Sequence, residues 1–297
     1  MAYEKSTWVD ETLSGNERYD IATNDGTAIN SNVQITLATP VAVAGTAVDA
    51  AKMNHIEQGI AGISIRLIDN AGAHNSIYRG ISLGTSVSAA QFAAIAAGTF
   101  EDMYIGDYWT IGGVVWRIWH FNYYYNVGDV NCTTPHVTIV PDTCLYNAQM
   151  NATDVVTGAY AGSAMYTTNL ATAKTTINTA FGAAHILNHR ILLANAVSGA
   201  AASGWAWYDS IVELMTEHQV YGTRAFGAPA NNGYGIASQD GQFAAASLHH
   251  AIIHNRNNYW LQDVVSAANF AIVDNAGRTG NYIASASFGV RPAFSII

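Results

Sequence analysis

The chain has 297 residues, half of them hydrophobic, and only 11% are Asp, Glu, Lys or Arg. This composition excludes a disordered chain or a charge-rich coiled coil as the whole structure, and the length allows a sizeable core. Twelve basic against 21 acidic residues give a net charge of −9 with no basic run, so no nucleic-acid partner is expected. No apolar run is long enough to cross a bilayer, so membrane insertion is not expected, and the charged N-terminus does not resemble a signal peptide.

Residues 1–45 are predicted to be a small β-rich segment. Residues 18–23 and a second run through residues 33–37 flank Asn24-Asp25-Gly26, which is typical of a hairpin. The Asp-Gly pair supplies the positive φ that such a turn needs. Pro40 is expected to end the second strand.

Residues 46–98 are predicted to be a helical connector. Thr46 and Asp49 fit a capping box at the start of a helix over residues 49–69. Apolar residues then recur with alternating spacings of three and four, which favours association of three or more helices because isoleucine occupies both core positions. These candidate oligomerisation residues are Met53, Ile56, Ile60, Ile63 and Leu67. An amphipathic helix packed on its own subunit is the alternative. A second short helix is expected over residues 86–97, ending at Gly98.

Residues 99–297 are predicted to be one α+β domain without internal repeats. Residues 107–111 and 114–119 flank Gly112-Gly113 and indicate a tight hairpin, and residues 137–140 indicate another strand. We expect a helix over residues 166–181 and a second one from Asp209. The buried stripe of this second helix would be Ile211, Val212, Leu214 and Met215. Short strands separated by Asn, Gly and Ser turns are expected over residues 259–297.

Patterns that would support catalysis or metal binding are weak, and we expect no enzyme, catalytic residue, metal or cofactor. His185 and His189 share the i, i+4 spacing of zinc ligands, as do His250 and His254, but no HExxH motif or third ligand accompanies them. The alternative is that these four histidines bind no metal. Glu213 and Glu217 lie one helical turn apart on the predicted helix. The two carboxylates could act as an acid–base pair on a sugar, or they could simply belong to a solvent-exposed face of the helix.

Two cysteines, Cys132 and Cys144, flank an apolar strand, so a disulfide and two free thiols both stay open. The chain has no CxxC motif, which excludes a structural zinc site built from cysteines.

Residues 1–60 resemble the virion-attachment segment of structural proteins of tailed bacteriophages that infect low-GC Gram-positive hosts. The resemblance is carried by YEKSTWVD at residues 3–10 and GTAVDAAKMNHIEQGI at residues 45–60. It implies a fibre or tail protein that docks onto other virion proteins and is assembled in the host cytoplasm.

Residues 100–297 are similar to domains with a C-type-lectin-like, or formylglycine-generating-enzyme-like, fold, including target proteins of diversity-generating retroelements. The motifs are YIGDYWTI at 104–111, VTIVPD at 137–142, WYDS at 207–210, YWLQDVV at 259–265 and GVRPAF at 289–294. The resemblance implies a variable display surface just before the closing strand. The calcium-lectin signatures Glu-Pro-Asn and Trp-Asn-Asp and the catalytic cysteines of formylglycine-generating enzymes are absent, so neither calcium-dependent sugar binding nor that activity is implied.

The tail between Asp263 and Gly289 has the composition of an adaptable binding surface, with amides and small residues punctuated by Tyr, Phe and Arg. Phe270, Ile272 and Ile283 are expected to point inward, leaving polar and aromatic residues on the outside. These candidate ligand-binding residues are Asn269, Asp274, Asn275, Arg278, Asn281, Tyr282, Ser285 and Phe288. Trp260 is predicted to be core, and Arg291 to pair with Asp263. A sheet edge without a ligand is the alternative.

The leading functional hypothesis is a phage tail- or head-fibre adhesin, anchored to the virion by its N-terminus, trimeric through residues 49–69, and binding host-surface polysaccharide or protein through its C-terminal domain. Two alternatives stay open. One is a capsid or tail decoration protein without a host receptor. The other is a glycan-cleaving tail enzyme that uses Glu213 and Glu217.

Overall fold

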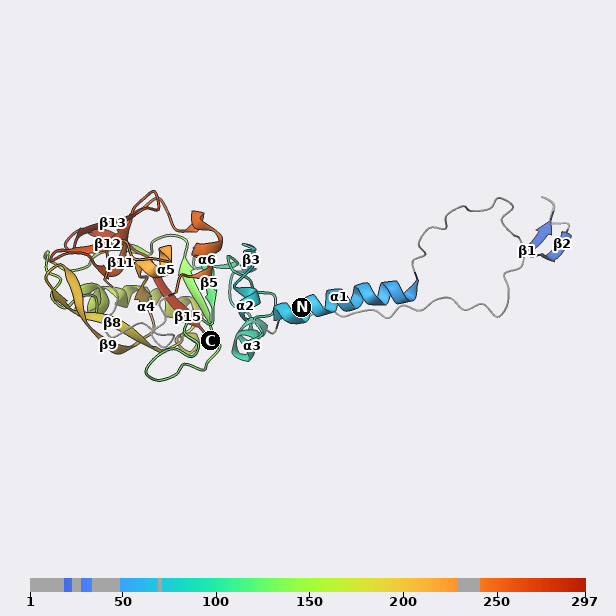
Figure 1. Cartoon of the computed structure of the whole chain (residues 1–297), viewed down its shortest axis with the longest axis horizontal. Helices are drawn as coiled ribbons and strands as arrows, with labels where there is room; N and C mark the ends of the chain where they lie inside the picture. Colours follow the sequence, from blue (N-terminus) through green and yellow to red (C-terminus); the bar gives the residue numbers. More distant parts are fainter. Residues whose placement is uncertain (1–18, 23–27, 34–48, 69–70, 229–240) are drawn as a thin grey trace. The chain divides into compact units, whose positions relative to one another are not determined.

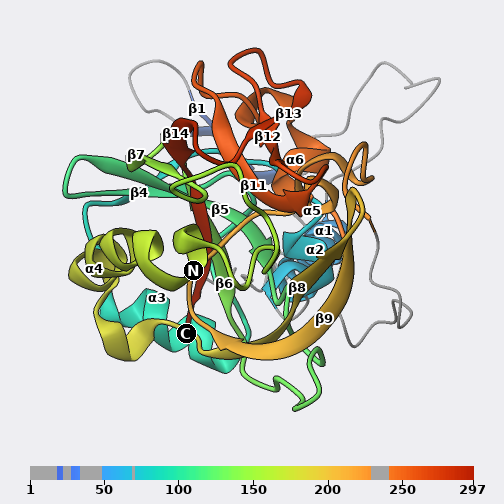
Figure 2. The same cartoon turned by 90° about the vertical axis from the view of Figure 1, so that its left-hand side faces the viewer.

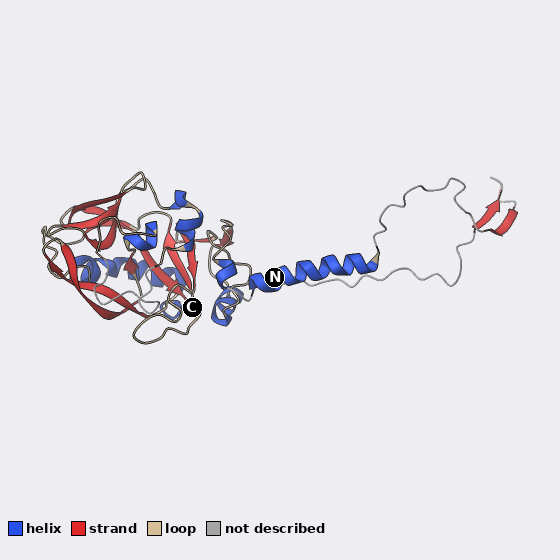
Figure 3. Cartoon of the chain, in the orientation of Figure 1, coloured by secondary structure: helices blue, strands red, loops and turns tan. Residues whose placement is uncertain are grey.

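The computed structural model describes residues 19–22, 28–33, 49–68, 71–228 and 241–297. The chain separates into two compact units, Ala2–Ile65 and Arg66–Ile297. With 26% of the described residues helical and 33% in strands, the protein is α+β, as predicted (Figure 3). No helix among the described residues is both long and apolar enough to cross a membrane.

The first unit contains the predicted hairpin and the start of a long helix (Figure 1). Strand β1 (Tyr19–Ala22) pairs antiparallel with β2 (Ala28–Val33), so the second strand begins earlier than expected, and residues 34–37 lie outside the described part. Helix α1 spans Ala50–Ile68. Asp49 precedes it and accepts a hydrogen bond from the Lys52 backbone N–H at 2.9 Å. Asp49 is therefore the N-cap residue of α1. The prediction had placed the N-cap at Thr46 and Asp49 three positions later, at N3.

The second unit begins before the predicted boundary at residue 98, because α2 (Ala71–His74), β3 (Ser82–Gly84) and α3 (Ala89–Ala97) all belong to it. Ser88 and Gln91 form a reciprocal capping box at the start of α3, and Gly98 ends the helix with φ 72°. Ile95 on α3 is fully buried in the core of this unit. The structure thus divides the chain between Ile65 and Arg66.

A six-stranded sheet forms the centre of the second unit, in the order β10-β15-β6-β5-β4-β3. The strands that join β3 are β4 (Tyr108–Ile111), β5 (Val114–Phe121), β6 (Val137–Pro141), β10 (Glu213–Leu214) and β15 (Pro292–Ile296). Gly112 and Gly113 connect β4 to β5 with φ values of 61° and 79°, which confirms the predicted tight hairpin. Trp109, Trp116 and Phe294 are fully buried.

A five-stranded sheet, in the order β13-β12-β11-β14-β7, lies at one end of this unit (Figure 2). Its strands are β7 (Tyr146–Gln149), β11 (Tyr259–Val264), β12 (Asn269–Val273), β13 (Thr279–Ile283) and β14 (Ser287–Val290). Phe270, Ile272 and Trp260 are buried as predicted. Ile283 is 40% exposed, so its predicted inward orientation is wrong. It stands opposite Asn269 in the β12–β13 pair and therefore lies on the other face of the sheet from Phe270 and Ile272.

Residues 189–216 differ most from the expectation. Strands β8 (His189–Ser198) and β9 (Ala201–Ser210) form a long curved hairpin that the sequence analysis missed (Figure 2). The predicted helix from Asp209 is wrong. Instead, β10 pairs with β15, and Thr216 caps a short helix, α5 (Glu217–Tyr221). Val212, Leu214 and Met215 of the expected stripe are nonetheless buried, whereas Ile211 is half-buried.

The remaining helices follow the sequence more closely. The predicted helix over residues 166–181 is observed as a π-helical turn, Met165–Asn169, that continues into α4 (Leu170–Phe181). Its buried residues Leu170, Ala173, Ile177 and Phe181 have the spacing of an amphipathic helix. Short helical segments also occur at Ala183–His185, at α6 (Ala244–Leu248) and at His250–Ile252.

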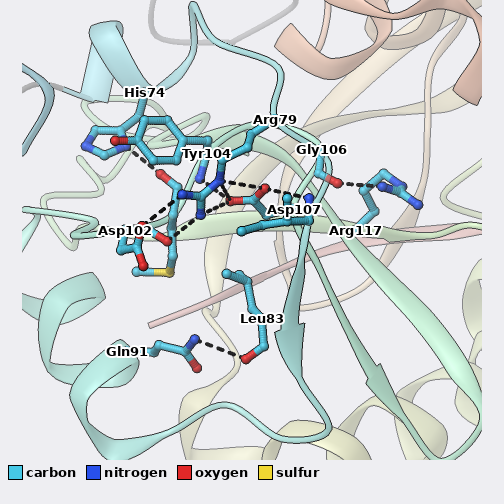
Figure 4. Close-up of polar contacts among 11 residues, drawn as sticks. His74, Arg79, Leu83, Gln91, Asp102, Tyr104, Gly106, Asp107 and Arg117 are labelled. Carbon is cyan, nitrogen blue, oxygen red and sulfur yellow. Dashed lines mark hydrogen bonds and ion pairs between the residues drawn. The ribbon is translucent and has the colours of Figure 1, made fainter. Parts of the chain in front are cut away.

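A buried carboxylate joins the segment before α3 to the central sheet. Asp107 is fully buried and accepts hydrogen bonds from the backbone N–H groups of Ile81 (3.0 Å) and Tyr104 (2.8 Å). It also accepts from the Arg79 guanidinium, whose closest nitrogen lies at 2.7 Å (Figure 4). Arg79 reaches Asp102 as well, and its guanidinium stacks over the Tyr104 ring. Every acceptor position of the buried carboxylate is therefore used.

The predicted pair between Arg291 and Asp263 is wrong. Arg291 is buried and donates to the carbonyl oxygens of Pro141, Ile252 and Ile253, and it lies over the rings of Trp119 and Tyr259. Several carbonyl dipoles thus take the place of a carboxylate partner.

Candidate functional site

An open hollow of about 250 Å³ lies at the surface of the five-stranded sheet. Its lining residues come from β7, from the loop before β11, from the β12–β13 turn and from β14. They are Asn147, Arg256, Asn257, Asn258, Asn275, Ser287, Phe288 and Gly289. Five of these side chains carry amide or hydroxyl groups, and one carries a guanidinium. We call this feature the amide hollow.

The loop over residues 255–258, on one side of the amide hollow, is held by its own amide side chains. The Asn255 side chain accepts from the Asn257 backbone N–H at 3.1 Å and donates to the sulfur of Cys144. This turn places Arg256 at a φ of 64° and leaves its side chain exposed. The geometry of the loop is therefore fixed by local hydrogen bonds before any ligand binds.

Asn258 ties this loop to the other walls of the amide hollow. Its carbonyl oxygen accepts from the Gly289 backbone N–H of β14 at 2.9 Å. Its side-chain oxygen accepts from the Asn275 backbone N–H, in the β12–β13 turn, also at 2.9 Å. Asn258 thus connects its own loop to β14 and to the β12–β13 turn by hydrogen bonds. These contacts make the amide hollow a preformed feature of the fold.

A glycine of β14 is part of the lining of the hollow. On β14, Gly289 stands directly opposite Asn147 of β7, so the cross-strand position beside this asparagine has no side chain. A Cβ atom at Gly289 would lie 2.2 Å from the Cys144 sulfur and therefore would not fit. Within the described residues, the side chains of Asn147, Asn257, Asn275 and Ser287 accept or donate no hydrogen bond, which leaves their polar groups available to a ligand.

Two aromatic rings continue the amide hollow on one side. Phe288 lines it and contacts Tyr282 edge-to-face, with ring centroids 5.0 Å apart. The ring of Trp260 lies 5.1 Å from Phe288 on the buried side and is fixed by a hydrogen bond from its Nε1 to the Ala148 carbonyl oxygen. Tyr282 is 48% exposed. The amides can hydrogen-bond to the hydroxyl groups of a sugar, and the aromatic rings, held in place by Trp260, can pack against the apolar face of the sugar ring.

The structure brings only some of the predicted ligand-binding residues together. Asn275 and Phe288 line the amide hollow, and Tyr282 contacts Phe288. Asp274 and Arg278 pair with each other at 2.9 Å and close the β12–β13 turn.

Three more of them lie elsewhere on the β12–β13 hairpin and the loop that follows it. Asn269 donates to Asn281 at 2.7 Å across the strands. The backbone of Ser285 accepts from Gln149 and donates to Asp154. None of these three residues lines the amide hollow.

Six lining residues were missed: Asn147, Arg256, Asn257, Asn258, Ser287 and Gly289. The run Asn255-Arg256-Asn257-Asn258 directly before the aromatic strand β11 was a usable signal, because three amides around an arginine are unusual in a chain with so few charges. Nothing in the sequence indicated Asn147, since its place in the hollow depends on the pairing of β7 with β14, 140 positions further along the chain.

The two glutamates of the catalytic alternative do not lie on one helix. Glu213 is in β10 and Glu217 begins α5, and both are buried, so neither the predicted helical pair nor a solvated face is observed. Glu217 accepts from the backbone N–H groups of Phe226 (3.0 Å) and Gly227 (2.7 Å) and from the Thr279 hydroxyl (2.8 Å). Its oxygens are thus engaged in holding the loop over residues 224–228 beside β13.

Glu213 occupies an apolar environment next to His189. Its carboxylate lies 3.4 Å from the imidazole, and burial raises the pKa of Glu213 to about 7. Burial also lowers the pKa of His189 to about 3. The ring of His189 stacks on Tyr124, with centroids 3.7 Å apart.

The other candidate metal-binding histidines and the two cysteines form no metal site or disulfide in the described part of the chain. His185 stacks on Phe92, whereas His250 and His254 are exposed. Among the described residues, no three His, Cys, Asp or Glu side chains gather closely enough to hold a metal ion. Cys132 and Cys144 are both free thiols.

Comparison with known proteins adds no relative: no family model matches this chain, and neither a curated protein nor a solved structure shows significant similarity to it.

Proposed function

We propose that this chain is a phage virion structural protein, a tail- or head-fibre adhesin, whose lectin-like domain binds a host-surface polysaccharide through the amide hollow. The observation that carries the proposal is a preformed surface hollow in which the side chains of Asn147, Asn257 and Asn275 make no hydrogen bond with the described chain. The half-buried ring of Phe288 lines the hollow and contacts the exposed ring of Tyr282. Preformed sites of this kind lose little conformational entropy on binding. The N-terminal unit would attach the molecule to other virion proteins.

We further propose that α1 associates as a trimer. Ile56 and Ile60 are 53% and 42% exposed, and they stand four residues apart on one face of the helix, together with Met53. Ile63 and Leu67 continue the same spacing, but their side chains are outside the described part. Three copies would multiply weak contacts at the hollow. Sedimentation equilibrium of the full chain should give three times 31.6 kDa, and an Ile56→Asp variant should give the monomer mass. A monomeric wild-type chain would exclude this part of the proposal.

The binding role is tested by retention of the full chain on purified cell walls from a panel of low-GC Gram-positive bacteria. Asn147→Ala and Phe288→Ala should each weaken retention by about tenfold or more on the wall that binds the wild type, because anchor residues of a site contribute about 2 kcal/mol. Tyr125→Ala is the matched control, since Tyr125 is 39% exposed but does not line the hollow. Asn147 is exposed, so this variant is expected to fold normally.

Two outcomes would contradict the proposal. If both hollow variants bind as well as the control, the hollow is not the binding surface. If the wild-type chain binds phage particles but no wall of the panel, the chain is a decoration protein rather than an adhesin.

A further inference from the structure

Arg256 differs from the other cationic side chains in the described part of the chain. It lines the amide hollow and is exposed, and it makes no ion pair or hydrogen bond with any described residue. By contrast, most other cationic side chains in this part contact a carboxylate, a run of carbonyl groups or an aromatic ring. These are Lys52, Arg79, Arg117, Lys174, Arg190, Arg224, Arg278 and Arg291.

The surroundings of Arg256 leave its charge unneutralised. Among the described residues, no carboxylate lines the amide hollow. The nearest acid on the β12–β13 turn, Asp274, is occupied: its oxygens accept from the guanidinium of Arg278 and from two backbone N–H groups. These contacts keep the pKa of Asp274 below its usual value. The hollow therefore presents a positive charge on a chain whose net charge is −9.

A guanidinium beside amide donors is the chemistry that recognises an oxyanion. Arginine offers several N–H donors in a planar fork that fits carboxylate and phosphate oxygens, and such charge-assisted hydrogen bonds are stronger than neutral ones. The unengaged amides of Asn257 and Asn275 line the same hollow and add neutral donors. A neutral sugar would leave the guanidinium without a partner, whereas an anionic sugar substituent would pair with it.

We propose that the amide hollow selects an anionic glycan, with Arg256 binding the carboxylate or phosphate group and the amides and Phe288 binding the sugar ring. This inference rests on the proposed function and specifies its ligand class. The two sources of the anion, a uronic acid and a sugar or polyol phosphate, share this chemistry and are separated by the experiment.

The experiment measures binding of the full-length wild type to three soluble probes: a glycerol-phosphate polymer, a glucuronate-containing polysaccharide and neutral dextran. We expect binding to one of the two anionic probes that weakens as NaCl is raised, and at least tenfold weaker binding to dextran. Arg256→Gln should lose at least tenfold in affinity for the anionic probe and most of the salt dependence. Arg256→Lys should recover part of the affinity, because it restores the charge but not the fork.

Lys52→Gln is the matched control, because it removes the same charge from α1, in the other unit of the chain. Gln and Arg tolerate the φ of 64° equally, so Arg256→Gln is not expected to disturb the loop. If Arg256→Gln binds the anionic probe as the wild type does, or if dextran binds equally well, the inference is wrong while the adhesin role stands. If the wild type binds no wall and none of the probes, the proposed function itself fails.

Discussion

Replacing Asp107 with alanine should destabilise the second unit strongly, with a loss of about 3–5 kcal/mol in the free energy of unfolding. The side chain is fully buried, and its removal leaves the Arg79 guanidinium and the backbone N–H groups of Ile81 and Tyr104 without their acceptor (Figure 4). Buried donors that lose an acceptor retain their full desolvation cost. Because Ile81 precedes β3, the segment that pairs with β4 should also loosen.

The control for Asp107→Ala is Asp102→Asn, which removes the charge of the second carboxylate that contacts Arg79. The Asp102 side chain is 67% exposed and asparagine tolerates the φ of 55° at this position, so this variant should cost less than about 1 kcal/mol. Urea unfolding followed by tryptophan fluorescence measures both effects, since all tryptophans except Trp8 belong to the second unit. Equal stability of the two variants would show that the buried carboxylate does not hold the segment.

Acidification from pH 7 to about pH 5 should destabilise the second unit by several kcal/mol. Burial lowers the pKa of His136 to about 4 and that of His120 and His189 to about 3, from an ordinary 6.5. A depressed histidine pKa means that the folded state disfavours the proton, so stability is complete above pH 6.5 and falls as the pH drops toward 3–4. At pH 5 each of the three histidines should cost about 2 kcal/mol.

Hydrogen bonding gives the acid effect a structural cause at two of these histidines. His136 accepts from the Tyr124 backbone N–H through Nε2 at 2.9 Å, and His120 accepts from the Ala244 backbone N–H through Nδ1 at 3.0 Å. A protonated imidazole has no acceptor nitrogen, so each contact would become a repulsive pair of donors. Protonation should therefore separate β5 from α6 and open the turn after β5.

Glu213 acts in the opposite direction and reduces the acid effect. Its pKa is raised to about 7, so the folded state favours the protonated acid, and stability is gained as the pH falls from 7 toward 4.5. This gain of about 2 kcal/mol offsets about one histidine. Urea midpoints at the two pH values measure the net change, and Glu213→Gln should make the loss on acidification larger. A midpoint that does not change with pH would contradict the assignment of His120, His136 and His189 as neutral at pH 5.

Local signals in the sequence were sufficient for elements whose ends are fixed by nearby residues. Gly112 and Gly113 specify the β4–β5 turn, and Gly98 specifies the end of α3, because positive φ at these positions is a property of the local chain. Phe270 and Ile272 were placed correctly for the same reason, since alternation along one strand indicates which side chains face the core.

Long-range pairing explains most of the errors. The apolar spacing at Val212, Leu214 and Met215 fits a helix, but the pairing of Glu213 and Leu214 with Ala293 and Pro292 makes this stretch a strand. Short apolar runs do not distinguish a buried strand from a helix.

The candidate site was only partly predictable for the same reason. The β12–β13 turn is local, and its Asn275 was identified. The opposite wall depends on Asn147 facing Gly289 across two strands, a contact that no periodicity in either segment indicates.

The central claim is that the amide hollow and its aromatic rings touch the host. Hydroxyl-radical footprinting tests it most directly, by comparing the free chain with the chain bound to Gram-positive cell wall. Tyr282 and Phe288 should become protected on the wall, while Tyr125, exposed to 39% and outside the hollow, should react as before. If the wall-bound chain is oxidised at Tyr282 and Phe288 as readily as the free chain, host contact occurs elsewhere and the account is wrong.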